Sequence, residues 1–294
     1  MSAELLEGSK TAKKYFYDYE EYEEQGKGPA AMTEEILADP DLPGLDELVI
    51  GAWGNCWEDN CQPLLDGIAA HADRFSQIRK LFVGDMDYEE CEVSWIIQGD
   101  FSALWAALPG LRELTIKGST DLVLGDIFHE NLESLTIICG GLPSDVIRSV
   151  QNAKLPNLKK LQLYIGIEDY GFDGNLDTIR EFLKKADFPA LTYLGLVDSE
   201  IQDEVTEAVL ASKFMGQIDT LDLSLGTLTD KGGALLLEKL PAWPNIKKLD
   251  VQYHYLSDEM MEKLSAFPIE VDVTEQNEVE VYHGETYMNA MLTE

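Results

Sequence analysis

Three aspartates, Asp222, Asp250 and Asp272, occupy the same position in three successive copies of a short motif with alternating apolar residues. If each copy is a strand of a parallel sheet, the carboxylates lie on neighbouring strands, about 4.8 Å apart. Like charges at that distance oppose folding, so the row needs a compensating cation. Lys248, two residues before Asp250, is one source of that charge. A partner's Arg or Lys, or a hard divalent cation, is another.

A histidine close to this row raises the question of catalysis. His254 stands between Tyr253 and Tyr255, just beyond the motif that carries Asp250. A histidine beside carboxylates can transfer protons, but the sequence offers no nucleophile, phosphate loop or metal triad to act with it. We therefore expect Tyr253 and His254 to belong to a binding surface. We expect no catalytic residue, metal or cofactor, and a protein that is not an enzyme.

Long segments that contain aromatic residues follow three of the motif copies. They are residues 51–59, 84–95 and 166–175. Because parallel strands end at one edge of a sheet, we expect these segments on a common edge. Trp57, Tyr88 and Tyr170 stand among acidic residues there, a combination that suits a protein–protein interface. Trp53 and Trp95 are instead expected to fill the core.

The composition limits the classes of partner. Among 294 residues, 55 Asp and Glu stand against 22 Lys and Arg, a formal net charge of −33. Affinity for nucleic acid depends on Lys and Arg that displace counterions from phosphate, so nucleic acids and anionic membranes are not expected partners. The chain has no apolar run of about 18 residues, and its first seven residues, MSAELLE, contain neither a basic n-region nor an apolar h-region. We expect a cytoplasmic protein that binds a protein with a basic or mixed surface.

The residues above are positioned by a repeated pattern, Leu-x-x-Leu-x-Leu, in which Ile, Val or Phe can replace Leu. Its middle apolar residue falls at positions 48, 81, 114, 135, 161, 194, 221, 249 and 271. The alternating end of each copy predicts a strand, and apolar residues at three-four spacing between copies predict helices. The repeat lengths are typical of leucine-rich repeats. We expect an α/β solenoid of eight to nine repeats, a horseshoe with parallel strands on its concave face and helices on its convex face.

Residues 221–232 resemble the long strand–helix repeat of ribonuclease-inhibitor-like proteins. That class has Asn or Cys three residues after the last apolar residue of the strand. The corresponding residues here are Trp53, Met86, Ser119, Gly140, Gly166, Ser199, Gly226 and His254. We therefore expect other groups to replace the usual hydrogen-bond ladder.

Five stretches, one of them within residues 221–232, resemble a family of bacterial cytoplasmic leucine-rich-repeat proteins. They are residues 49–54 (VIGAWG), 90–96 (ECEVSWI), 140–143 (GGLP), 221–226 (LDLSLG) and 253–258 (YHYLSD). The resemblance covers about residues 42 to 290. It implies a cytosolic repeat protein without an assigned activity. The family looks like one found beside genes for radical-SAM and ATP-grasp-like enzymes, which implies an accessory role.

We expect three parts in the chain. Residues 1–41 are an N-terminal cap or an arm that folds on a partner, residues 42–273 are the repeat domain, and residues 274–294 form a hairpin cap. The expected function is that of a non-catalytic scaffold that binds a protein on its acidic concave face or its loop edge. The alternatives are an accessory subunit or weak hydrolase of a biosynthetic gene cluster, and a repeat protein that binds a divalent cation.

Overall fold

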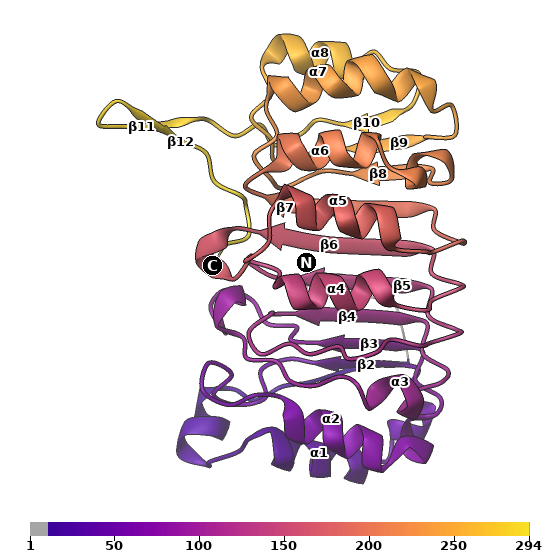
Figure 1. Cartoon of the computed structure of the whole chain (residues 1–294). Coiled ribbons are helices and arrows are strands. Elements are labelled where there is room, and N and C mark those ends of the chain that lie inside the picture. Colours follow the sequence, from indigo (N-terminus) through magenta and orange to yellow (C-terminus); the bar gives the residue numbers. More distant parts are fainter. Residues whose placement is uncertain (1–10, 294) are drawn as a thin grey trace. The chain divides into compact units, whose positions relative to one another are not determined.

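The computed structural model describes residues 11–293, which divide into two compact units. Unit 1 contains residues 11–138 and 152–158, and unit 2 contains residues 139–151 and 159–293. Each unit is an α/β repeat fold in which parallel strands follow one another in chain order (Figure 1).

Unit 1 has five parallel strands, each paired with the next along the chain. They are β1 (Ala12–Tyr15), β2 (Glu47–Ile50), β3 (Lys80–Val83), β4 (Glu113–Lys117) and β5 (Ser134–Ile138). Its helices are α1 (Pro29–Ala38), α2 (Gln62–Ala70) and the short α3 (Leu104–Ala107). The middle leucines of the repeated pattern, at positions 48, 81, 114 and 135, are in register and buried.

Unit 2 has five more parallel strands in the same order. They are β6 (Lys160–Gly166), β7 (Tyr193–Ser199), β8 (Thr220–Asp222), β9 (Lys248–Asp250) and β10 (Glu270–Asp272). The helices are α4 (Ser144–Asn152), α5 (Leu176–Lys185), α6 (Gln202–Leu210), α7 (Asp230–Lys239) and α8 (Asp258–Ser265). The residues at positions 161, 194, 221, 249 and 271 are again in register. All nine strands that the apolar pattern predicts are therefore present and parallel.

Strand β1 is not predicted by the apolar pattern, because its sequence, AKKY, does not alternate apolar and polar residues. Its lysines are stabilised by acids from elsewhere in unit 1: Lys14 lies 3.2 Å from Asp85, and Lys13 forms an ion pair with Asp39. The chain then buries Tyr17, whose N–H donates to Ala52 O over 2.7 Å. Residues 11–17 thus extend the sheet beside β2. Residues 1–10, the first part of the predicted cap or arm, lie outside the described residues.

Two buried glutamine side chains donate hydrogen bonds to carbonyl groups of the parallel strands. Gln98 Nε2 donates to Lys117 O over 2.7 Å, and Gln202 Nε2 donates to Leu196 O over 2.9 Å. Both glutamines are fully buried.

Trp53 fills the core, as predicted, and donates through Nε1 to Asp59 O over 2.9 Å. The core prediction for Trp95 is wrong, because its side chain is 58% exposed.

The C-terminal part of unit 2 begins with an antiparallel hairpin, β11 (Glu280–Tyr282) and β12 (Glu285–Tyr287). The hairpin is present as the sequence indicates, but its six strand residues are exposed, so they do not bury the end of the repeats. Residues 289–293, which we call the C-terminal strap, then run back along unit 2. Met291 N donates to Leu225 O over 2.8 Å, and Leu292 N donates to the buried Asp198 Oδ1 over 2.9 Å.

Candidate functional site

The three aspartates of unit 2 form a row across β8, β9 and β10. Asp222 is aligned with Asp250, and Asp250 with Asp272. The alignment follows from the apolar register, since each aspartate comes one residue after the middle apolar residue of its copy. We call these three residues the carboxylate row.

Each carboxylate in the row is fixed by a turn where its strand ends. The backbone N–H groups of Ser224, Gln252 and Thr274, each two residues further on, donate to an Oδ1 atom over 3.1, 3.2 and 3.1 Å. Such local bonds are typical of aspartate at a turn. They leave Oδ2 of each aspartate for other partners.

Asp222 is buried and satisfied by neighbours that lie far from it in the sequence. Tyr193 OH and Gln162 Nε2 both donate to its Oδ2, the latter over 3.0 Å, while the nearby Ser224 Oγ donates to Oδ1 over 2.6 Å. Gly195 makes this possible, because a Cβ there would meet Gln162 Cγ at 3.0 Å and Tyr193 Cε1 at 3.2 Å. The sequence reasoning missed these partners, and a glycine at the equivalent position of the neighbouring strand is the signal that could have revealed them.

Asp250, at the centre of the row, is compensated less completely. Lys248 Nζ is 4.0 Å from Asp250 Oδ2 but 3.1 Å from Glu270 Oε1, so the expected internal cation is shared with another acid. The Asp250 side chain is 18% exposed. Burial, together with the neighbouring Asp222 carboxylate, raises the pKa of Asp250 to about 6.

Asp272 is the most exposed member of the row and lies on β10, the last of the parallel strands. Its Oδ1 accepts from Thr274 Oγ1 over 2.7 Å, and its Oδ2 accepts from Gln252 Nε2. Partial burial raises the pKa of this carboxyl, but the hydrogen bonds from Thr274 and Gln252 outweigh burial and lower it overall. Gln252 thus links the turn after β9 to Asp272.

His254 lies near the carboxylate row, but its ring is buried and contacts backbone groups through both nitrogens. Its ring is 1% exposed, with Nε2 2.9 Å from Val273 O, and Leu256 N donates to Nδ1 over 3.0 Å. Both ring nitrogens are therefore engaged with backbone groups, and burial lowers the pKa of the ring. The neighbouring Tyr253 is half-buried with a φ of 54°.

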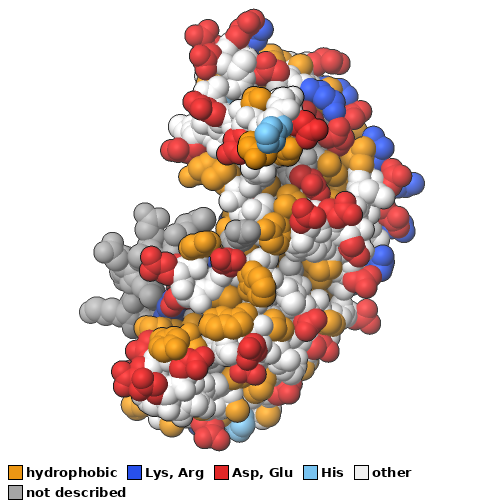
Figure 2. Space-filling model, turned by 90° about the vertical axis from the view of Figure 1, so that its left-hand side faces the viewer, with side chains coloured by type: hydrophobic (Ala, Val, Ile, Leu, Met, Phe, Trp, Pro, Cys, Tyr) orange, Lys and Arg blue, Asp and Glu red, His pale blue; other side chains and the backbone are white. Residues whose placement is uncertain are grey.

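The aromatic residues predicted at a loop edge fall in both units. In unit 1, Tyr88 is 67% exposed and Trp57 is partly exposed, with its ring 6.2 Å from that of Tyr22. The Tyr22 ring in turn lies 5.6 Å from that of Tyr19. Tyr170 belongs to unit 2 and is half-buried. Figure 2 shows a face of the molecule on which hydrophobic side chains lie among Asp and Glu.

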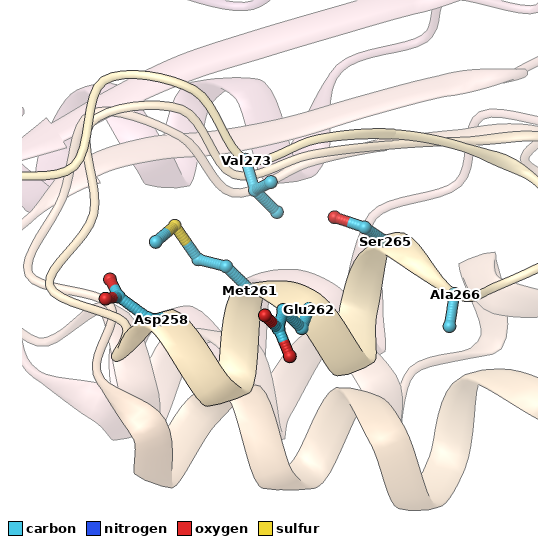
Figure 3. A pocket seen from close by; sticks show the side chains of 6 residues that line it. All are labelled: Asp258, Met261, Glu262, Ser265, Ala266 and Val273. Atoms are coloured by element: carbon cyan, nitrogen blue, oxygen red, sulfur yellow. The ribbon is translucent and has the colours of Figure 1, made fainter.

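A hollow of about 660 Å³ opens at the end of the repeats in unit 2. Its lining, shown in Figure 3, consists of Asp258, Met261, Glu262, Ser265, Ala266 and Val273. All but Val273 come from α8 or the residue that follows it.

Within residues 11–293, no group of three or more His, Cys, Asp or Glu side chains is arranged to hold a metal ion. In the same part of the chain, no helix has the length and apolar character needed to cross a bilayer.

The fold and the row define an α/β repeat protein with an acidic strand face. The structure is similar to the crystal structure of a Bacteroides fragilis protein determined by the Northeast Structural Genomics Consortium. The TM-score is 0.85 and the sequence identity 42%, over 91% of this chain and 75% of that one. The chain therefore belongs to the same family as that bacterial protein. No protein-family model and no curated protein sequence matches it.

Proposed function

We propose that this protein is a non-catalytic binding protein whose carboxylate row receives Lys or Arg side chains of a partner protein. The observation that carries the proposal is the position of Asp250 between two carboxylates, with Lys248 drawn toward Glu270. A guanidinium or ammonium group placed between Asp250 and Asp272 would form charge-assisted hydrogen bonds there. It would also offset the burial and the repulsion from Asp222 that together raise the pKa of Asp250.

We further propose that the repeats are leucine-rich repeats of a cytoplasmic solenoid. In such a horseshoe the row would face the concave side, where repeat proteins commonly bind their partners. The parallel strands and the register of the leucines support this interpretation. A partner with a basic or mixed surface would be steered toward the acidic chain.

The contacts of both His254 ring nitrogens with the backbone favour a binding function over catalysis. A general base needs a ring nitrogen within reach of the substrate proton, whereas both nitrogens of His254 contact the backbone. A divalent cation is also a weaker candidate than a partner's side chain. The Asp222 carboxylate already accepts from Tyr193, Gln162 and Ser224 and is 3% exposed.

A titration with a hexa-arginine peptide tests the proposal. We expect the double variant Asp250→Asn/Asp272→Asn to bind this peptide at least about tenfold more weakly than the natural chain. The reason is that a hydrogen bond to a charged group contributes about 1.5–3 kcal/mol. Isothermal titration calorimetry at physiological ionic strength measures the difference.

The matched control removes two negative charges elsewhere in unit 2. Glu238→Gln/Glu262→Gln changes exposed glutamates on α7 and α8 and alters the net charge equally. This control should bind within about twofold of the natural chain, because general attraction to exposed charges is largely screened. An equal loss of peptide affinity in both double variants would show that binding depends only on net charge, and would contradict the proposed site.

A further inference from the structure

The β11–β12 hairpin is anchored to unit 2 at both ends. Before β11, Asn277 N donates to His254 O over 2.7 Å, and Gln276 Nε2 donates to Leu256 O over 2.7 Å. After β12, Asn289 N donates to Tyr255 OH over 2.9 Å, and the C-terminal strap follows. The hairpin is thus anchored at both ends and projects from the repeats of unit 2 (Figure 1).

The hairpin has two different faces, both exposed. Side chains alternate across a strand, and the register pairs Glu280 with Tyr287, Val281 with Thr286 and Tyr282 with Glu285. Among the paired residues, one face therefore carries Val281 and Thr286. The other carries Glu280, Tyr282, Glu285 and Tyr287. Two of the most exposed large hydrophobic side chains, Val281 at 69% and Tyr282 at 66%, belong to opposite faces.

The backbone of β11 presents an open edge. His283 and Gly284 form a two-residue turn with positive φ angles of 51° and 86°, as in a type I′ hairpin. In such a hairpin the residues that flank the turn bond to each other, so the N–H and C=O of Val281 point away from β12. Among residues 11–293, β11 and β12 make a sheet of two strands. A two-stranded sheet is marginal in water, and its edge can pair with another strand.

The charges decide which strand fits this edge. Residues 278–288 contain three glutamates and no Lys or Arg. A second copy of β11 would place glutamates beside glutamates, which is unfavourable, on a chain with a net charge of −33. A strand that alternates apolar residues with Lys or Arg would instead cover Val281 on one face. On the other it would place cations beside Glu280 and the Tyr282 ring.

We infer that the outer edge of β11 binds an extended segment of a partner protein, with alternating apolar and basic residues, by addition of a strand. The main-chain bonds of Val281 give the affinity, and the two faces select the sequence. This site is separate from the carboxylate row and does not depend on it.

A synthetic hexapeptide of alternating lysine and valine, labelled with fluorescein, tests the inference by fluorescence anisotropy. Val281→Pro removes the N–H at the open edge of β11, and we expect it to weaken binding tenfold or more. Thr286→Pro makes the same change at the edge of β12 and should leave binding unchanged. Because both positions are exposed, neither variant alters the core, and the amide NMR spectrum of the repeats checks this. Equal binding by the natural chain and Val281→Pro would overturn the inference.

Three further measurements distinguish strand addition at β11 from binding at the carboxylate row and from self-association. A glutamate–valine hexapeptide should not bind, and equal binding by it would overturn the charge argument. The weakening caused by Val281→Pro should be the same in the Asp250→Asn/Asp272→Asn background, and its disappearance there would assign the peptide to the carboxylate row. Sedimentation equilibrium should show a monomer. A dimer that Val281→Pro dissociates would instead make a second copy the occupant and overturn the inference.

Discussion

Replacement of Asp250 by Asn is expected to stabilise the protein at pH 8 by up to about 3 kcal/mol. The folded protein holds the pKa of Asp250 at about 6, against an ordinary 3.8. The folded state therefore binds this proton more tightly than the unfolded state. Each pKa unit corresponds to about 1.4 kcal/mol. Stability contributed by this group is lost as pH rises from about 4 to 6. Asparagine does not ionise, so the variant does not lose this stability as the pH rises.

Urea denaturation at pH 4 and pH 8, followed by circular dichroism, measures this effect. We expect the stabilisation by Asp250→Asn to be large at pH 8 and to shrink toward pH 4. Glu238→Gln, which changes an exposed helical glutamate, should alter the free energy of unfolding by no more than about 0.5 kcal/mol. Destabilisation by Asp250→Asn at pH 8 would mean that the carboxylate is well compensated, and would remove the physical basis of the proposed site.

Replacement of Gly166 by Ala is expected to destabilise unit 2 by about 2–5 kcal/mol. Gly166 ends β6 with a φ of +71°, and an added Cβ would lie 1.9 Å from Gly140 O. That oxygen accepts from Ile167 N over 2.9 Å, so the methyl group would disrupt the contact between the turn at residues 140–141 and the end of β6. An alanine at positive φ adds its own strain.

Gly216→Ala is the matched control in the same unit. Its added methyl group would meet Trp243 Cζ3 at 3.8 Å, an ordinary contact, and Gly216 has no positive φ. The melting temperatures of the two variants give the comparison. We expect a clear decrease for Gly166→Ala and a small change for Gly216→Ala. Similar values for both would show that residues 140–141 move aside without cost.

The apolar pattern predicts the strands and the carboxylate row because register follows directly from repeated leucines. Leu221, Leu249 and Val271 align, and the aspartate after each must then align as well. Strand β1 is beyond this reasoning, since its lysines depend on acids that approach only in the folded chain, such as Asp85 for Lys14. Trp95 illustrates the opposite error, because a large apolar side chain in a loop need not be buried.

The partners of the row are harder to predict than the row itself. Tyr193 reaches Asp222 from a strand that lies 29 residues earlier, and it does so because Gly195 leaves space. His254 is a candidate for proton transfer in the sequence only because it follows closely after Asp250. Its bonds to Val273 O and Leu256 N are fixed by backbone positions that no sequence pattern specifies.

The most direct test of the central claim is the pKa of Asp250 itself, measured by carbon-13 NMR of its carboxyl group with and without the hexa-arginine peptide. The free protein should titrate near pH 6, and saturation with the peptide should lower the pKa, because a bound guanidinium favours the ionised carboxylate. An unchanged pKa in the saturated complex would show that the cation binds elsewhere and would contradict the carboxylate row as the binding site.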